Sequence, residues 1–283
     1  MTTPARVPRW FTKAAWYLAL VGLSIPFVFP FLWMISSSFK NSTEMFAFPP
    51  TLIPETLRWR NFVQVFEYQP FAQQYFNSVY IAALVTIATI LVSSMAGYAF
   101  ARIRFRFSTL IFFLMLTALM MPIEVTIIPN FFFMRLLGLV NTHVPLIVLP
   151  VFGSSGVVAT FLMRQYFLSL PTELEEAAMI DGMGRFGIFF KIALPLARPA
   201  LGSVGILTFL YSWNSFLEPL VFVNDLNLFT LPLALNTFTD SYGLPLWHLQ
   251  LAATTLSVIP ILVVYVLAQR QVVESFAMSG MKG

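Results

Sequence analysis

The chain has 283 residues, of which 58% are hydrophobic and only 10% are charged, and its mean hydropathy is +0.81. This composition excludes an ordinary water-soluble domain, whose solvated surface needs more charge. The net charge of +4 does not point to nucleic acid, because the basic residues are scattered between apolar stretches and form no single stripe. With no cysteine and only two isolated histidines, His143 and His248, we expect neither a disulfide nor a bound metal ion.

Six apolar stretches are long enough to cross a membrane as helices, because a hydrocarbon core about 30 Å thick needs about 20 residues for each crossing. In chain order they are residues 14–36, 77–100, 108–129, 144–168, 200–223 and 249–268. The first follows a short N-terminal tail, residues 1–13, and its apolar run is too long for a signal peptide. The sequence therefore predicts an all-α, polytopic membrane protein that forms a single domain over residues 1–283.

Basic residues predict the orientation in the membrane, because Lys and Arg are enriched in cytoplasmic segments. If the N-terminus is inside, twelve of the 16 Lys and Arg residues fall on the inner side and four on the outer side. We therefore expect both termini in the cytoplasm. The polar segment 170–199, between the fourth and fifth predicted helices, is then cytoplasmic as well.

Small residues and prolines predict the shape of individual helices. The small residues within positions 93–97 would let the second helix approach a neighbour closely, as small residues do in lipid. Pro122 and Pro129 in the third helix and Pro260 in the sixth remove backbone donors, so we expect bends there. Bent helices suit a substrate pathway.

The polar segment 170–199 begins with signals for a short helix. Thr172 and Glu175 fit a capping box, in which the threonine oxygen accepts from a first-turn amide and the glutamate reaches back. The helix should end near Asp181 and Gly182, because glycine readily takes the left-handed conformation. A helix of about ten residues is not stable alone and must gain its order from contacts.

The expected helix also has a face without bulk. Ala177 and Ala178 form this face, and Leu174 and Ile180 flank it. Such a shape fits the groove of another protein, whereas the alternative is a solvated loop with a few acids. The spacing of the next motif favours the partner protein.

A motif with fixed spacing runs through this segment. Glu176-Ala177-Ala178 is followed by Gly182, then by Ile192 and Leu194-Pro195. Seven fixed positions match by chance at any one start with a probability on the order of 10⁻⁸ at background residue frequencies. This EAA motif closely resembles the signature of the permease subunits of bacterial ABC importers.

Further matches narrow the resemblance to the maltose-type carbohydrate permeases and extend it over nearly the whole chain. They are Ser38-Phe39-Lys40, Pro49-Pro50, Asn77-Ser78, AGYAFAR at 96–102, Met121-Pro122, Ile128-Pro129, Leu137-Gly138-Leu139, Asn141-Thr142, Ser212-Trp213-Asn214 and SGMKG at 279–283. Each match is weak alone, and their common order makes them specific.

The resemblance implies a non-enzymatic membrane subunit that forms half of a translocation pathway for a carbohydrate or similar hydroxyl-rich solute. The implied partners are a second permease subunit in a heterodimer, two ATP-binding subunits and an external solute-binding protein. The chain has no G-x-x-x-x-G-K-[ST] sequence, so ATP and Mg are expected on the partner subunits and no cofactor on this chain. The implied location is the cell membrane, or inner membrane, of a bacterium or archaeon.

The resemblance also assigns roles to the polar segment. Residues 171–185 are expected to form a cytoplasmic coupling helix that docks in a cleft of an ATP-binding subunit. Glu176 would pair with a basic residue of that subunit, and Gly182 would shape the turn. With Ala177, Ala178 and Asp181, these are the expected coupling residues.

Acidic and polar residues inside the predicted helices are candidates for the substrate pathway. Glu124 and Glu218 are the two acids there, and a charge at the bilayer centre costs about 2.5–3.5 kcal/mol on insertion scales. Tyr211, Asn214 and Glu218 recur at helical spacing and would share one face of the fifth helix. Alternatively, Glu218 reaches the membrane surface and Asn214 bonds a neighbouring helix.

Two other classes of membrane protein stay open as alternatives. Gly153-Ser154-Ser155-Gly156 and His248 resemble the elements of a rhomboid-type intramembrane serine protease, which needs its serine within hydrogen-bond reach of a histidine. A Gly-Ser cluster can equally serve helix packing or a kink. The second alternative is an ion-coupled secondary transporter that uses Glu124 and Glu218, and the polar segment argues against it.

Overall fold

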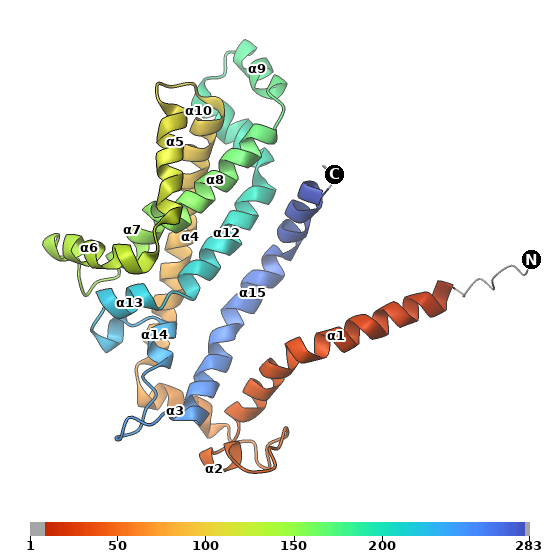
Figure 1. Ribbon diagram of the computed structural model, residues 1–283, viewed down its shortest axis with the longest axis vertical. Coiled ribbons are helices and arrows are strands. Elements are labelled where there is room, and N and C mark those ends of the chain that lie inside the picture. The colour runs from red at the N-terminus through yellow and green to blue at the C-terminus, as the bar shows by residue number, and fades with distance from the viewer. Residues whose placement is uncertain (1–8, 281–283) are drawn as a thin grey trace, which may run out of the picture. The chain divides into compact units, whose positions relative to one another are not determined.

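The computed structural model describes residues 9–280 of the chain (Figure 1). Most of the predicted tail, residues 1–8, and residues 281–283 of the C-terminal motif lie outside the described residues. The described part confirms the all-α fold class. It divides into two compact units, one of Met1–Tyr68 with Phe238–Leu256 and the other of Gln69–Thr237 with Ser257–Gly283.

Within residues 9–280, four helices are long and apolar enough to cross a membrane, and up to six spans result if each of two bent helix pairs is one span. The four are Trp16–Ser38 within α1 (Arg9–Ser38), α4 (Phe71–Arg102), the stretch Val144–Ser169, and Trp247–Gln269 within α15 (Trp247–Gly280). The bent pairs are Ser108–Met120 with Ile123–Leu136, at 104°, and Arg185–Leu196 with Arg198–Trp213, at 76°. The prediction of a polytopic membrane protein is confirmed.

The third predicted span contains the sharper bend. Helix α5 (Ser108–Thr117) and a 3₁₀ turn end before Pro122, and α6 (Ile123–Leu136) starts after it. Pro122 is in extended backbone, with φ −61° and ψ 144°. Met121 before it is extended too, with φ −88° and ψ 116°, because a residue before proline avoids helical conformation. The bend predicted at Pro122 is confirmed. Helix α6 continues through Pro129, so the predicted end at residue 129 is wrong.

The fifth predicted span, 200–223, is not one helix. Helix α12 (Arg198–Trp213) ends with Asn214 as its cap, and α13 (Leu217–Phe222) follows after a short break. Pro219 explains the break, because in a continuous helix its ring would clash with the carbonyl of residue 215 and its missing N–H would leave that carbonyl unpaired. Proline is tolerated in the first turn of a new helix, where α13 places it.

Helix α4 is central in the second unit and packs on α8 (Ser154–Ser169) and α12. At Gly97 the backbones come so close that an added Cβ would lie 2.8 Å from both the Met163 Cβ and the Arg164 N. Ser93 and Ser94 of the same stretch are buried. The close helix approach predicted from the small residues is therefore confirmed.

The fourth predicted span is interrupted by a glycine-dependent kink between α7 (Val144–Phe152) and α8. A Cβ on Gly156 would lie 1.8 Å from the Val151 carbonyl oxygen, and one on Gly153 would lie 2.5 Å from the Leu149 carbonyl oxygen. Only residues without side chains fit there. The Gly-Ser cluster is thus a kink feature, as one of its two interpretations predicted.

The polar segment folds into short helices between α8 and α12. In chain order they are α9 (Glu173–Ile180), α10 (Arg185–Ile188), a π-helical turn (Phe189–Ala193) and α11 (Leu194–Leu196). Beyond α13, a 3₁₀ turn (Leu226–Leu228) and α14 (Leu231–Leu235) complete the second unit apart from its part of α15.

The first unit contains α1, α2 (Ser42–Met45), α3 (Arg60–Tyr68) and the first residues of α15. Lys40 is buried there at 1% exposure, with its ammonium over the Trp33 ring and a hydrogen bond to the Thr51 carbonyl. The Asn61 amide donates to the carbonyls of Ser38 and Lys40 at 2.8 and 2.9 Å. These contacts order the chain after α1.

Candidate coupling surface and intramembrane cavity

Helix α9 ends as the sequence predicts. Gly182 has φ +79°, in the left-handed region where glycine carries no Cβ penalty. Its N–H bonds the Met179 carbonyl at 3.0 Å, and the Met183 N–H bonds the Ala178 carbonyl at 2.9 Å. These bonds satisfy carbonyls of the last turn, so Gly182 fixes the direction in which the chain leaves α9.

The predicted capping box at the start of α9 is wrong. Thr172 has helical backbone angles, and its side chain makes no capping hydrogen bond. The Glu175 carboxylate points instead to α4, with Oε1 2.9 Å from the Arg102 Nε and Oε2 accepting from the Tyr98 hydroxyl at 3.1 Å. The Glu175 carboxylate therefore forms an ion pair with the Arg102 guanidinium and accepts from Tyr98, and it does not reach back to a backbone amide at the start of α9.

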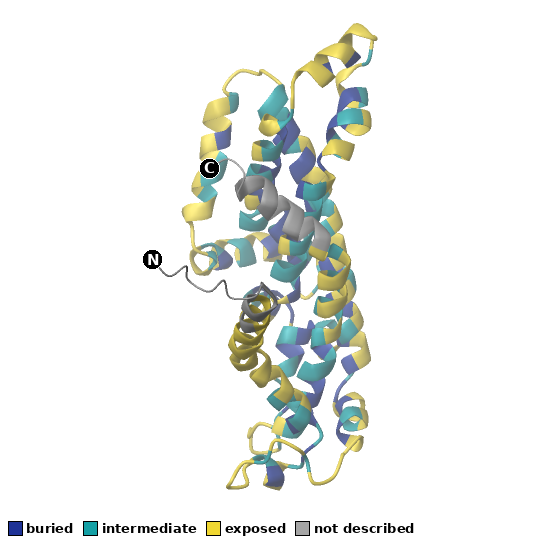
Figure 2. Ribbon diagram, turned by 90° about the vertical axis from the view of Figure 1, so that its right-hand side faces the viewer, coloured by how far each residue is buried: buried dark blue, intermediate teal, exposed yellow. Residues whose placement is uncertain are grey.

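The two faces of α9 differ in burial (Figure 2). Glu175 and Ala178 are buried, and Ala178 joins the core cluster around Tyr98 and Phe167. Ala178, expected on a docking face, therefore packs inside its own chain, because the helix turns it to the same side as Glu175 three residues earlier.

The outward face of α9 carries the remaining coupling candidates. Leu174, Glu176, Ala177 and Ile180 are exposed, and the exposed fraction of Ile180 is 86%. We call these four residues the α9 outer face. It combines the Glu176 carboxylate with three apolar side chains whose exposure to water is unfavourable. Asp181 and Gly182, next in the chain, are exposed too.

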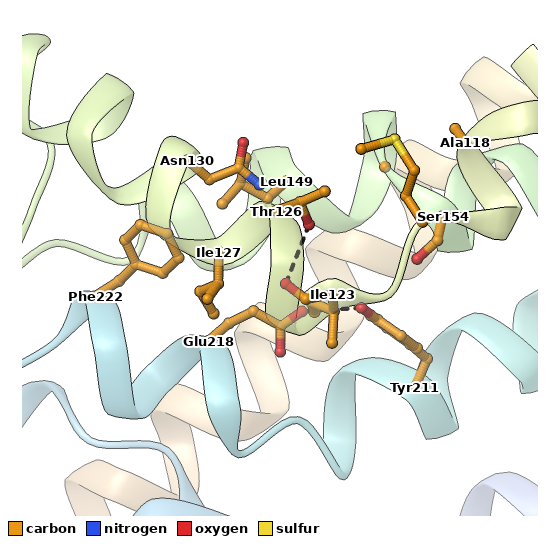
Figure 3. Close-up of a pocket in the computed structure, with 12 residues that line it drawn as sticks. Ala118, Ile123, Thr126, Ile127, Asn130, Leu149, Ser154, Tyr211, Glu218 and Phe222 are labelled. Carbon is orange, nitrogen blue, oxygen red and sulfur yellow. Dashed lines mark hydrogen bonds between the residues drawn. The ribbon is translucent and has the colours of Figure 1, made fainter.

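A cavity of about 180 Å³ lies in the second unit, where α6, α12, α13 and the α7–α8 kink meet (Figure 3). The Tyr211 hydroxyl donates to the Glu218 Oε1 at 2.9 Å, and the Ser215 hydroxyl donates to the other carboxylate oxygen. Glu218 is 6% exposed and therefore does not reach the surface of the described part. The lining residues are Ala118, Met121, Ile123, Thr126, Ile127, Asn130, Leu149, Gly153, Ser154, Tyr211, Glu218 and Phe222.

The cavity brings together two of the four predicted pathway residues, Tyr211 and Glu218. Asn214 does not line it, because α12 ends there, and its amide donates to the Leu210 carbonyl at 2.8 Å. Glu124 is exposed in the first turn of α6 and also lies outside the lining. The predicted polar stripe along one continuous helix is therefore wrong.

Sequence patterns alone missed most of the polar groups in this cavity. Thr126, Asn130 and Ser154 line it beside Glu218. Ser154 stood out only as part of the Gly-Ser cluster, and the two residues of α6 carry no motif. Together these groups supply hydroxyl, amide and carboxylate oxygens that can exchange hydrogen bonds with a polyol.

The structure offers no support for the catalytic pair of a serine protease. The His248 Nδ1 has the Ser42 hydroxyl as its partner, at 3.1 Å. His143 lies between the Tyr80 hydroxyl and the Leu228 carbonyl. Among the described residues, no group of three His, Cys, Asp or Glu side chains is placed to hold a metal ion.

Residues 89–276 match the family described as binding-protein-dependent transport system inner membrane component. The chain belongs to this family. The permease is 40% identical over 274 residues to the arabinooligosaccharides transport system permease protein AraQ of Halalkalibacterium halodurans, covering 95% of this chain and 97% of the relative. It is 34% identical over 282 residues to the sulfoquinovosyl glycerol transport system permease protein SmoH of Agrobacterium fabrum, covering 100% and 98%.

Two further similarities agree with this assignment. The permease is 34% identical over 260 residues to the sn-glycerol-3-phosphate transport system permease protein UgpE of Yersinia enterocolitica, covering 89% of this chain and 91% of the relative. Its fold matches a chain of a bacterial ABC transporter involved in alginate import, with a TM-score of 0.77, 21% identity, and coverage of 95% and 99%. The prediction of an ABC importer permease in a cell membrane is confirmed, and none of these similarities supports an intramembrane protease.

Proposed function

We propose that this permease forms half of the translocation pathway for a neutral carbohydrate and couples its import to ATP hydrolysis by separate subunits. The proposed complex contains a companion permease, two ATP-binding subunits and an external solute-binding protein. ATP and Mg would be bound by the ATPase subunits. The relative whose name specifies arabinooligosaccharides supports a neutral, hydroxyl-rich solute.

The α9 outer face is the observation that carries this proposal. An eight-residue helix is too short to be stable in isolation, yet α9 exposes Leu174, Ala177 and Ile180 together. Burial of these side chains in an ATPase cleft would remove apolar surface from water. The Glu176 carboxylate would then pair with a basic group of the ATPase.

Basic residues near α9 support the proposed orientation in the membrane. Arg102 ends α4, and Arg104 and Arg106 lie in the connection to α5, at the end of the unit where Arg102 contacts α8 and α9. Because Lys and Arg are enriched in cytoplasmic segments, this charge supports a cytoplasmic α9 and cytoplasmic termini.

The cavity supports a neutral rather than an anionic solute. Glu218 would present a buried carboxylate beside the path, and a like charge in a site of low dielectric is repelled strongly. Hydroxyl groups of a sugar would instead donate to it, with Ser154 and Asn130 as further partners. Tyr211 would hold the carboxylate in place from α12.

Copurification tests the coupling role. The permease is purified with its companion permease and tagged ATPase subunits, and retained ATPase is measured after gel filtration. Glu176→Arg should lose most of the ATPase, because it reverses the charge of the α9 outer face. Glu67→Arg, which changes an exposed glutamate on α3, should retain it. Full retention by Glu176→Arg would contradict the proposed docking.

A further inference from the structure

Arg102, the last residue of α4, contacts both α9 and Leu170, the residue that follows α8. Its Nε is 2.9 Å from the Glu175 Oε1, and its terminal nitrogen donates to the Leu170 carbonyl at 2.6 Å. The Arg102 and Glu175 side chains are only 8% and 9% exposed. From the preceding turn of α4, Tyr98 donates to the second Glu175 oxygen. We call this set of contacts the α4–α9 ion pair.

The surroundings keep this ion pair in one geometry. The Tyr98 ring makes edge contact with Phe167 of α8 at 5.5 Å between centroids and lies 5.2 Å from the Phe189 ring of the π-helical turn. Tyr98 and Phe167 are 3% and 0% exposed. The hydrogen bonds from Arg102 to Leu170 and from Tyr98 to Glu175 are directional, unlike the apolar contact that Ala178 makes. A displacement of α9 must therefore move the end of α4.

The far end of α4 is fixed just as specifically. The Asn77 amide donates to the carbonyls of Asn227 and Phe229 at 2.7 and 3.0 Å, and the Ser78 hydroxyl accepts from the Leu231 N–H at 2.7 Å. The 32 residues of α4 span about 48 Å at 1.5 Å per residue. One helix therefore joins α9 to the segment that follows α13.

We propose that the α4–α9 ion pair transmits motion of the ATPase-docked α9 to α4, and through α4 to residues 226–231 beside the pathway. This inference rests on the proposed function, and it makes Arg102, Glu175 and Tyr98 positioning residues. Motion then reaches the pathway through α4 and not only through α8 and α12, which continue the chain on either side of the polar segment. The pair stays closed during the transport cycle.

The number of ATP molecules hydrolysed per imported solute tests the pair directly. The complete complex is reconstituted in vesicles, with Glu175→Gln, Arg102→Gln and the double variant. Each single variant should retain the ATPase subunits and raise this ratio at least about fivefold, the lower end of typical coupling effects. Glu67→Gln, which removes an exposed ion pair with Arg60, should leave the ratio unchanged.

The double variant separates a shared contact from two independent ones. If both residues act through one pair, losing both should raise the ratio no more than losing either. An increase equal to the product of the single effects would overturn the proposal, as would an unchanged ratio in Glu175→Gln. If Glu176→Arg loses the ATPase while Glu175→Gln stays coupled, the transmission role fails and the docking role stands. If the unmodified permease binds no ATPase, the proposed function itself fails.

A labelling experiment distinguishes transmission from simple stabilisation. The chain has no cysteine, so Phe76→Cys places a single thiol on an exposed position near the far end of α4. Its labelling rate should change when a non-hydrolysable ATP analogue is added. In Phe76→Cys with Glu175→Gln, the rate without nucleotide should be the same and the nucleotide-dependent change should be lost. A change that persists, or one absent in Phe76→Cys alone, would overturn the proposal.

Discussion

The Tyr211 hydroxyl and the Glu218 carboxylate are joined by a 2.9 Å hydrogen bond across the break between α12 and α13. In a continuous helix the two residues would be separated by about 10 Å along the axis, at 1.5 Å per residue. The break therefore creates the contact, and it turns the carboxylate toward the cavity lined by α6 (Figure 3).

Removing the charge of Glu218 should change both affinity and selectivity. Hydrogen bonds to a charged group contribute about 1.5–3 kcal/mol, so Glu218→Gln is expected to raise the KM for import of a neutral sugar by about tenfold or more. It should also allow an anionic sugar to compete. Uptake into vesicles over a range of solute concentrations measures both. Tyr211→Phe keeps the charge and should leave anions excluded; unaltered KM and selectivity in Glu218→Gln would contradict a solute site here.

Substitutions of Gly182 should be tolerated only if the new residue can adopt a positive φ. A β-branched residue at φ +79° is strained, and the left-handed conformation costs about 1–2 kcal/mol for a residue with a Cβ. Gly182→Val should therefore reduce ATPase retention and import severalfold, whereas Gly182→Asn should be milder because asparagine adopts this conformation. Gly184→Ala, with open space and φ −74°, is the control. Equal activity of the valine and asparagine variants would count against a role for the turn.

The close approach of α4 and α8 predicts a stability effect at Gly97. Gly97→Ala places a Cβ 2.8 Å from a backbone nitrogen, and overpacking of this kind costs about 1–3 kcal/mol. Thermal unfolding of the purified permease should occur at a lower temperature. In the matched variant Gly205→Ala, the new Cβ meets only side-chain ends, Ile90 at 3.3 Å and Thr86 at 3.8 Å, and the midpoint should change less. Indistinguishable midpoints would show that the helices separate at little cost.

Ser155 should be dispensable, because it is no nucleophile. His248 is engaged with Ser42, and the neighbouring glycines serve the α7–α8 kink. Ser155→Ala is therefore expected to import solute at the rate of the unmodified permease. Loss of a measurable proteolytic activity in Ser155→Ala, with import unchanged, would favour the protease alternative.

Hydropathy predicted most of the fold because the bilayer sets helix length, whatever the details of packing. Local chemistry was also right at Pro122, where the helix breaks, and at Gly182, where α9 ends. Hydropathy failed in the fifth predicted span, where the apolar composition gave no sign of the break between α12 and α13. Pro219 was the available signal, because proline has no backbone N–H and its ring clashes with the carbonyl four residues earlier.

The sites depended on contacts between distant residues and were predicted less well. Thr172 and Glu175 satisfy the local rule for a capping box, but Arg102 is 73 positions earlier in the chain and takes the carboxylate. The cavity likewise needs α6, α12, α13 and the kink to meet, so Thr126 and Asn130 could not be selected from sequence. The periodicity of polar and apolar residues predicts which face of a helix a residue lies on, but not which neighbouring element that face contacts.

The most direct measurement of the central claim is uptake of a labelled neutral oligosaccharide by vesicles that contain the permease, its companion, the ATPase subunits and the solute-binding protein. We predict uptake only when ATP is present on the side of α9, and its loss in Glu176→Arg with the permease still in the membrane. Uptake by vesicles that lack the ATPase subunits, driven by an ion gradient, would contradict the account.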